Sequence, residues 1–311
     1  MSESIFCSVV IPVFNSEASL SELVDRTACF FEAKKISYEV ILVNDGSRDQ
    51  SWKLIKKMSQ TRKPIVAIDL LRNYGQHKAM HCGFKHARGR YVITMDDDLQ
   101  NPPEEIGKLI EKAGEGHDLV IGRYAVKYHS LFRRLGSSAV SFLNEKIFEK
   151  PRDLAMSNFR MVERGVIERV LGFPGVRPYI PGLLILYASR PVNAEVEHKS
   201  RSYGRSHYSF QKIMRVIFSI LFSYSVYPLR ALAAAGGAVA IFSFFLAGGF
   251  FIHGLMHQSK VMGWTSLAFM ISFFSGFIIL LLGVLGEYVI HITRTLNQPD
   301  SYHIREISRH G

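Results

Sequence analysis

The chain has 311 residues, which is enough for one large domain and an appended segment. It is basic, with a formal net charge of +11, and so it suits anionic partners such as nucleic acid, a membrane surface or phosphorylated substrates. Its three cysteines, Cys7, Cys29 and Cys82, lack the spacing of a metal site and are typical of reduced thiols.

Apolar runs alternate with amphipathic stretches over the first 122 residues. The runs are rich in β-branched residues and predict strands, while apolar residues at helical spacing predict the helices between them. The expected strands are 8–13, 38–43, 65–71, 91–95 and 118–121, and the expected helices are 17–34, 50–59, 77–87 and 103–114. This order predicts an α/β fold with a mostly parallel sheet that is covered on both faces.

Polar residues follow the expected strands where each strand ends. The carboxyl ends of parallel strands meet at one edge of a sheet, and ligands bind in the crevice beyond that edge. These residues should therefore converge on one site: Asn15, Asp45, Arg72, Asp96, Asp97, Asp98 and Arg123.

The most informative stretch is 91–105, YVITMDDDLQNPPEE. Its apolar run ends in Asp96, Asp97 and Asp98, three like charges that a divalent cation would hold together. Asn101 is the expected N-cap of the next helix, with prolines in its first turn. The alternative is a solvated acidic turn.

Residues 123–207 are richer in positive charge. Some of these side chains are expected on the ordinary surface, and others should face phosphate groups in the crevice. Neither a P-loop nor a G-x-G-x-x-G motif is present, so kinase and dinucleotide-binding functions are excluded.

The last third of the chain predicts membrane attachment. Residues 208–228 have the pattern of an amphipathic interface helix, with docking against the first domain as the alternative. Two uncharged stretches, 232–252 and 264–285, predict transmembrane helices at about 231–253 and 264–290, within a segment 229–293. Their flanking arginines and lysines place the 1–207 domain, the 294–311 tail and both termini in the cytosol. Small residues in the first stretch are compatible with homo-oligomer formation.

These parts together indicate a substrate pair. A metal site and arginines suit a nucleoside diphosphate, with Mg²⁺ or Mn²⁺ as the cation. The hairpin formed by the two predicted transmembrane helices suits an acceptor held in lipid. Asp45 could accept hydrogen bonds from a nucleobase or ribose, Asp96 could reach the ribose or diphosphate, and Asp98 with Gln100 could hold the ion. Nucleic-acid binding would explain the charge but not the hairpin, and is not expected.

Several motifs, in order, carry a resemblance to a known family: VVIPVFN, VNDGS, LRNYGQHKAMHCGF, MDDDLQNPPEE and LLGVLGEYVIHI. The set resembles the polyprenyl-phosphate glycosyltransferases of glycosyltransferase family 2. This group includes dolichol-phosphate mannose synthases and the undecaprenyl-phosphate glucosyltransferases and formyl-aminoarabinose transferases. The resemblance covers nearly the whole chain.

The resemblance implies a GT-A fold and inverting transfer of one sugar from a nucleotide sugar to a polyprenyl phosphate such as undecaprenyl phosphate. UDP is the expected nucleotide, with GDP left open, and the expected place is the cytosolic face of a bacterial inner membrane. The product would supply cell-envelope glycan or lipid A modification. The implied catalytic residues are Asp96, Asp98, Arg123 and Arg160, with Asp98 and Gln100 as metal ligands. The implied nucleotide-sugar contacts are Pro12, Phe14, Asn15, Glu17, Asp45, Arg72, Asp96, Asp97 and Asp98, and the implied acceptor-phosphate contacts are Arg123, Arg133, Ser137, Arg201 and Arg205.

Some positions depart from the family pattern. Ser16 replaces a usual acid, Asn158 stands where some relatives have an aspartate, and Asp97 is commonly a small residue. His77 either touches the donor or caps its helix. Two other functions remain as alternatives: a processive polysaccharide synthase, which would need more membrane spans, and a non-catalytic nucleotide-sugar-binding scaffold.

Overall fold

The computed structural model describes residues 5–124, 140–173, 179–199, 263–297 and 302–310, together with scattered positions between 214 and 245. The chain forms two compact units. Unit 1 comprises Met1–Ile213 and Pro299–Gly311, and unit 2 comprises Met214–Gln298. The chain therefore leaves unit 1 once and returns to it at the carboxyl terminus.

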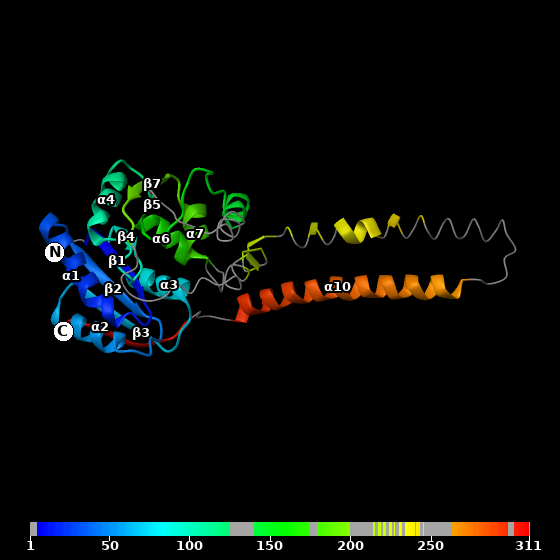
Figure 1. Cartoon of the computed structure of the whole chain (residues 1–311), viewed down its shortest axis with the longest axis horizontal. Coiled ribbons are helices and arrows are strands. Elements are labelled where there is room, and N and C mark those ends of the chain that lie inside the picture. The colour runs from blue at the N-terminus through cyan, green and yellow to red at the C-terminus, as the bar shows by residue number, and fades with distance from the viewer. Residues whose placement is uncertain are drawn as a thin grey trace. The chain divides into compact units, whose positions relative to one another are not determined.

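Unit 1 is built on an eight-stranded sheet in the order β7-β5-β6-β4-β1-β2-β3-β8 (Figure 1). The four adjacent strands β4, β1, β2 and β3 run parallel to one another, and β5 runs parallel to β7. Strands β6 and β8 run antiparallel to the strands they join. The strands are β1 Cys7–Val13, β2 Tyr38–Asn44, β3 Ile65–Leu70, β4 Tyr91–Thr94, β5 Leu119–Tyr124, β6 Arg160–Glu163, β7 Pro191–Val196 and β8 Ile304–Arg309.

Helices cover both faces of this sheet. One layer contains α1, α2 and α4, and the other contains α3, α6 and α7. The central strand β1 is buried at all seven positions because both layers cover it, whereas the edge strand β8 is mostly exposed. The helices are α1 Glu17–Lys34, α2 Ser51–Thr61, α3 Gln76–His86, α4 Ile106–Gly114, α6 Arg164–Leu171 and α7 Ile180–Tyr187, with a 3₁₀ turn η1 at Pro103–Glu105.

The predicted mostly parallel α/β sheet is confirmed, and the five predicted strands and four predicted helices are present with bounds shifted by up to three residues. The role expected of Asn101 is wrong. The 3₁₀ turn begins at Pro103 without a side-chain cap, and Asn101 is buried, where its Oδ1 accepts a hydrogen bond from the Tyr124 hydroxyl (2.8 Å). The last residues, expected as a separate tail, instead supply β8 to the sheet.

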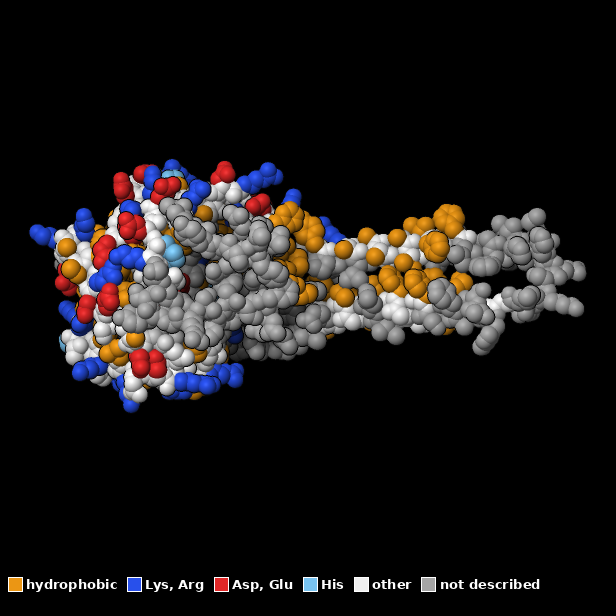
Figure 2. Space-filling model, viewed as in Figure 1, with side chains coloured by type: hydrophobic (Ala, Val, Ile, Leu, Met, Phe, Trp, Pro, Cys, Tyr) orange, Lys and Arg blue, Asp and Glu red, His pale blue; other side chains and the backbone are white. Residues whose placement is uncertain are grey.

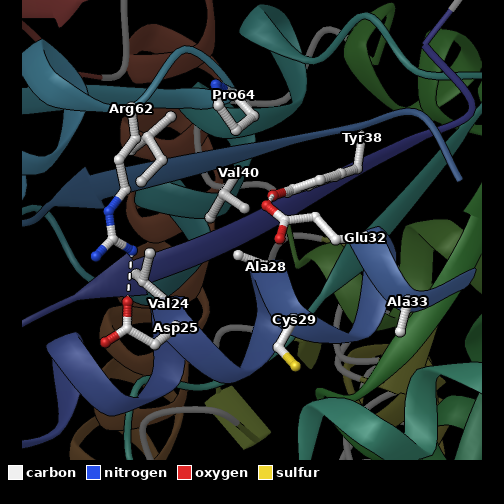
Figure 3. Close-up of a pocket in the computed structure, with 11 residues that line it drawn as sticks. Val24, Asp25, Ala28, Cys29, Glu32, Ala33, Tyr38, Val40, Arg62 and Pro64 are labelled. Carbon is white, nitrogen blue, oxygen red and sulfur yellow. Dashed lines mark hydrogen bonds and ion pairs between the residues drawn. The ribbon is translucent and has the colours of Figure 1, made fainter. Parts of the chain in front are cut away.

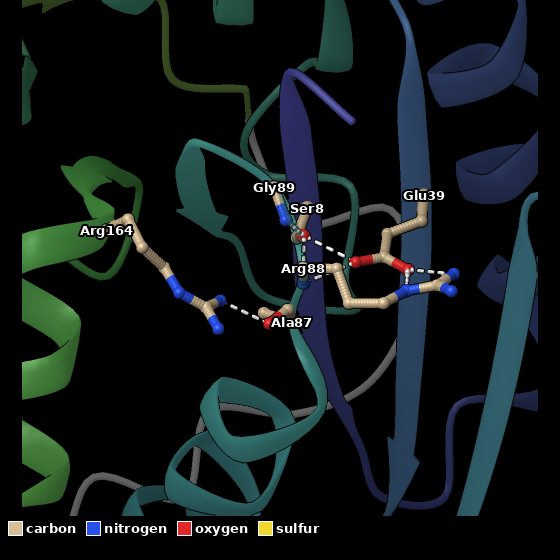
Figure 4. Close-up of polar contacts among 6 residues, drawn as sticks. All are labelled: Ser8, Glu39, Ala87, Arg88, Gly89 and Arg164. Carbon is tan, nitrogen blue, oxygen red and sulfur yellow. Dashed lines mark hydrogen bonds and ion pairs between the residues drawn. The ribbon is translucent and has the colours of Figure 1, made fainter. Parts of the chain in front are cut away.

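A buried carboxylate ties the strands together at their amino-terminal ends (Figure 4). Glu39 on β2 accepts hydrogen bonds from the Ser8 hydroxyl on β1 (2.6 Å) and from the Arg88 guanidinium (2.8 and 3.0 Å). The loop that carries Arg88 leads directly into β4. The start of β4 is therefore fixed relative to β1 and β2 before the strand reaches the opposite edge of the sheet.

Unit 2 contains α10, Trp264–Asn297. Within the described residues, no helix is both long and apolar enough to cross a membrane. Large apolar side chains are exposed along this unit (Figure 2), among them Phe242, Phe245, Ile271, Leu282 and Ile292. The predicted interface helix, 208–228, falls largely outside the described residues.

Candidate active site

The loops that follow β1 and β2 are joined by hydrogen bonds from backbone N–H groups to side-chain oxygens. The Asn15 N–H donates to Ser47 Oγ (3.0 Å), and Asn15 Oδ1 accepts from the Arg48 N–H (2.8 Å). Glu17 Oε2 likewise accepts from the Gln50 N–H (2.7 Å). Both Asn15 and Glu17, which the resemblance assigns to donor binding, thus hold the two loops at a fixed separation.

Asp96 and Asp97, which follow β4, contact opposite helix layers of the fold. Asp97 lies on the α1 side. Its carboxylate accepts hydrogen bonds from the Phe14 N–H (3.0 Å) and from the Ser16 hydroxyl, and its carbonyl accepts from Ser19 Oγ (2.6 Å). Burial raises the pKa of Asp97, and these donors oppose that shift. Asp97 therefore fastens the β1–α1 loop to β4, a role that the sequence analysis had not assigned.

Replacing Asp97 by alanine should lower the free energy of unfolding by about 1–2 kcal/mol, because the Phe14 N–H and the Ser16 hydroxyl lose a charged acceptor. Chemical denaturation of the full chain in detergent measures this change. Asp25→Ala is the matched control, since the one polar contact of the Asp25 side chain within the described residues is an exposed ion pair with Arg62, and its loss should cost less than about 0.5 kcal/mol. Equal losses in the two variants would contradict the fastening role.

Asp45 is buried at the end of β2 and is held by the loop after β3. Its two oxygens accept hydrogen bonds from the N–H groups of Tyr74 (2.7 Å) and Gly75 (2.9 Å). Burial raises its pKa, and the two N–H donors act against the shift. The same loop passes close to Gly46, whose φ is 69° and where a Cβ atom would lie 2.5 Å from the Asn73 nitrogen. Only glycine allows this approach.

Asp96 lies on the α3 side of the sheet. Its carboxylate accepts hydrogen bonds from Gln76 Nε2 (2.6 Å), at the start of α3, and from Asn158 Nδ2 (3.3 Å). Burial raises the pKa of Asp96 to about 6, and the nearby charge of Asp98 adds to the shift. The first two aspartates thus divide between the two layers, while the negative charge of Asp98 acts on Asp96.

A buried guanidinium lies near Asp96. Arg160, at the start of β6, is 1% exposed, and it donates to Thr94 Oγ1 (3.2 Å) and to Asn158 Oδ1 (3.0 Å). Burial lowers its pKa to about 10, and the charge of Asp96 opposes this shift. Ile121 of β5 pairs with Arg160, and Arg123 lies two residues farther along β5. By strand alternation, Arg123 therefore lies on the same face of the sheet as Arg160.

The groups expected to hold a metal, Asp98 and Gln100, are oxygen donors in the segment that follows β4. Asp98 Oδ1 accepts from the Gln100 N–H (3.1 Å), and Gln100 Nε2 contacts His198 Nε2 (3.4 Å). Among the described residues, no group of three or more His, Cys, Asp or Glu side chains forms a metal site. This donor set fits Mg²⁺ or Mn²⁺, because hard cations at phosphate sites use one or two carboxylates and take further ligands from the substrate. Burial and the charge of Asp98 raise the pKa of Asp96, and a bound cation would favour its ionised form.

Comparison with known proteins decides the family. The profile described as glycosyl transferase family 2 matches residues 8–170, from β1 to the end of α6. The chain belongs to this family. The glycosyltransferase is 34% identical to a protein of Photorhabdus laumondii over 96% of this chain and 93% of the relative, and 35% identical to proteins of Proteus mirabilis (96% and 93%) and Shewanella sediminis (97% and 92%). Each of these relatives is named undecaprenyl-phosphate 4-deoxy-4-formamido-L-arabinose transferase.

Solved structures resemble the glycosyltransferase over about 70% of its chain. Glucosyl-3-phosphoglycerate synthase from Mycobacterium tuberculosis, solved with Mn²⁺, uridine diphosphate and phosphoglyceric acid, aligns with a TM-score of 0.53 at 17% identity, over 70% of this chain and 78% of that chain. The same enzyme solved with phosphoglyceric acid aligns with a TM-score of 0.53 at 18% identity, over 70% of this chain and 79% of that chain. This likeness shows a GT-A-like fold, as predicted.

The remaining predicted site residues of the glycosyltransferase differ in how exposed they are and in what they contact. Pro12 is buried within β1, while Phe14 is 46% exposed and Arg72 lies 5.2 Å from the Tyr74 ring centre. Four predicted acceptor contacts lie outside the described residues: Arg133, Ser137, Arg201 and Arg205. Sequence reasoning missed Gln76 as a partner of Asp96, although its place beside the expected start of a helix at this sheet edge could have indicated it.

A hollow of about 580 Å³ lies beside α1 and the amino-terminal ends of β2 and β3 (Figure 3). Its wall is mainly apolar and includes the Arg62–Asp25 ion pair (2.5 Å). None of the aspartates that follow β4 lines it. The candidate active site, where Asp45, Asp96 and Arg160 lie at the carboxyl edge of the sheet, is therefore separate from this hollow.

His77, in the first turn of α3, faces Tyr179 with the ring centres 5.7 Å apart. Its Nδ1 is buried and has no hydrogen-bond partner among the residues that the structure describes, and burial with the charge of Arg160 lowers its pKa to about 4. The imidazole of the glycosyltransferase is therefore neutral near pH 7. His77 does not cap α3 through its side chain, because the helix has no side-chain cap.

Because the pKa of His77 is lowered in the folded chain, the free energy of unfolding should depend on pH. The unfolded chain binds a proton at His77 near the ordinary pKa of 6.5, and the folded chain does so only near 4. The stability that His77 contributes should fall as the pH drops from 6.5 to 4, by at most about 1.4 kcal/mol per pH unit. Denaturation of wild type and His77→Gln at several pH values measures the difference, with His310→Gln as the exposed control. A difference that stays constant with pH would rule out this origin.

Proposed function

We propose that this enzyme transfers a single sugar, with inversion, from a UDP-sugar to a polyprenyl phosphate such as undecaprenyl phosphate at the cytosolic face of the membrane. The product is a lipid-linked sugar for modification of cell-envelope glycan or lipid A. One observation carries the proposal: Asp45, Asp96 and Arg160 converge at the carboxyl edge of the sheet in a chain whose relatives over more than nine-tenths of its length are named undecaprenyl-phosphate transferases.

The residues of the site take complementary parts in this proposal. Asp45 faces the nucleobase or ribose, and Asp96 faces the ribose and diphosphate. The Arg160 guanidinium, held by Thr94 and Asn158, stabilises negative charge on the departing diphosphate. Asp98 and the Gln100 amide oxygen would hold Mg²⁺ or Mn²⁺, which when bound neutralises the charge of the leaving group.

The acceptor is an anion and needs no strong general base. A phosphate oxygen attacks the anomeric carbon, and the bond from that carbon to the nucleoside diphosphate breaks on the opposite side. Asn158 stands where a base would be placed, and its amide is already engaged by Asp96 and Arg160. We assign the phosphate of the acceptor to Arg123, Arg133, Ser137, Arg201 and Arg205.

A lipid acceptor requires membrane attachment of the enzyme. The uncharged stretches 232–252 and 264–285 have the length for two transmembrane helices, and residues 208–228 have the pattern of an interface helix. The apolar side chains exposed along unit 2 support this arrangement, because water-exposed surfaces rarely gather so many. Both termini would then lie in the cytosol with the catalytic unit.

Mass spectrometry of the lipid product tests the proposal. The purified full chain is incubated in detergent with undecaprenyl phosphate, Mg²⁺ or Mn²⁺, and one nucleotide sugar at a time. The UDP derivative of 4-deoxy-4-formamido-L-arabinose comes first, because the relatives carry that sugar in their names. UDP-glucose, UDP-N-acetylglucosamine and GDP-mannose complete the panel. A mass increase of one sugar is expected with one UDP-sugar, and addition of several sugars or of none would contradict the proposal.

A further inference from the structure

The carboxyl-terminal segment packs against the part of unit 1 that carries the donor loops. Strand β8 pairs antiparallel with β3, with Asp69 opposite Glu306 and Leu70 opposite Ile304. Just before β8, Tyr302 is 7% exposed and lies beside α3, with its ring 5.6 Å from Lys85 Nζ. The segment therefore covers both the edge strand and the helix on either side of the β3–α3 loop.

The start of that loop is bound from two sides by this segment. The Leu71 N–H donates to the His303 carbonyl (2.9 Å), and the Leu71 carbonyl accepts from the Arg305 guanidinium (2.7 Å). The same guanidinium donates to Asp69 Oδ2 (3.1 Å). One arginine thus joins the last residues of β3 to the first residue of the loop.

These contacts continue to the candidate donor site. Asp69 is 1% exposed, and its other oxygen accepts from Asn44 Nδ2 (2.7 Å). Asn44 immediately precedes Asp45, and Asp45 in turn accepts from the N–H groups of Tyr74 and Gly75 at the far end of the loop. Arg305 is therefore linked to Asp45 by two routes. Through Asp69 and Asn44 it is linked to the strand that precedes Asp45, and through Leu71 it is linked to the loop whose N–H groups bind the Asp45 carboxylate.

We propose that Arg305 is a positioning residue for nucleotide-sugar binding, which acts through Asp69 and Leu71 to hold Asp45 and the 71–75 loop in the geometry that receives the donor. The inference rests on the proposed function only for the identity of the ligand. Arg305 is itself 56% exposed, so its charge alone contributes little. Its effect comes from the simultaneous bonds to a buried carboxylate and a backbone carbonyl, which the planar guanidinium holds in a fixed geometry that the single nitrogen of a lysine does not reproduce.

The experiment compares the full-length wild type with Arg305→Ala and Arg305→Lys, and with Arg309→Ala as the control on the same strand. Arg309 is exposed and makes none of the contacts to Asp69 or Leu71. Hydrogen exchange of the Tyr74 and Gly75 amides reports the loop directly, without any donor. Steady-state transfer then gives KM for the donor separately from kcat.

In Arg305→Ala, both amides should exchange about five to ten times faster, and the donor KM should rise about fivefold with kcat within twofold of wild type. Arg305→Lys should lie between the two, and Arg309→Ala should match wild type. Asp69→Asn combined with Arg305→Ala should add less than the sum of the single effects, because both changes interrupt one path.

Exchange and KM in Arg305→Ala that match those of Arg309→Ala would overturn the inference. So would a uniform loss of protection over the whole of unit 1, which would show a general loss of stability instead of a local one. If wild type transfers no sugar from any donor, the proposed function fails, and the exchange data still decide whether Arg305 holds the loop.

Discussion

Replacement of Asp98 by alanine is expected to lower kcat/KM for sugar transfer by about a thousandfold, because the leaving diphosphate would lose its cation. Asp98 follows directly on the two aspartates that divide between the faces of the sheet, and its charge raises the pKa of Asp96. Its removal should also weaken Mn²⁺ binding measured by calorimetry in the presence of UDP. The two measurements together separate loss of metal from loss of donor.

Glu104→Gln is the control for Asp98→Ala, since Glu104 is an exposed acid six residues farther on that pairs with Arg26 on the surface. It should leave transfer and metal affinity within about twofold of wild type, as expected for an exposed pair. Full activity of Asp98→Ala with added Mg²⁺ or Mn²⁺ would show that the metal role assigned to Asp98 is wrong.

Replacement of Arg160 by methionine should lower kcat/KM by about a hundredfold, which corresponds to the loss of one strong electrostatic contact to the leaving group. It should also lower the free energy of unfolding by about 3 kcal/mol near pH 7.5, because the buried Asp96 loses its compensating charge. Lipid-product analysis and chemical denaturation measure the two effects. Arg152→Met, at an exposed arginine eight residues earlier, is the control and should change neither.

A second variant separates catalysis from stability at Arg160. The double replacement Arg160→Met with Asp96→Asn removes both buried charges, and so it should recover most of the lost stability while remaining inactive. If the double variant regained transfer together with stability, Arg160 would serve only to balance Asp96.

The three aspartates after β4 show which features of the site the local sequence pattern can predict. The apolar run before them predicted that they lie at the carboxyl end of a buried strand, and the structure confirms this placement for β4. The structure then divides Asp96 and Asp97 between the two helix layers. Which face carries α1 and which carries α3 depends on the crossover helices, and so the contacts of Asp97 with Phe14 and Ser16 could not be assigned from sequence.

Loop contacts show the same limit. Asn15 and Glu17 were expected to meet the donor because of their motif, and in the structure both hold the loop after β2. A polar residue in a loop can bind a ligand or a neighbouring loop with the same atoms. The contact with the neighbouring loop is seen only in the folded structure, and the expected contact of both residues with the donor stays a prediction.

Local periodicity was sufficient for the order of the first five strands and their helices, and for the edge at which Asp45, Asp96 and Asp98 gather, because side-chain spacing and strand direction are encoded by adjacent residues. Long-range pairing was not accessible in this way. Strand β6 enters antiparallel between β4 and β5 and brings Arg160 opposite Thr94, and β8 returns after the whole of unit 2 to bring Arg305 to Asp69. Such pairings join residues far apart in the chain, and their free energy depends on the packed sheet as a whole rather than on any local pattern.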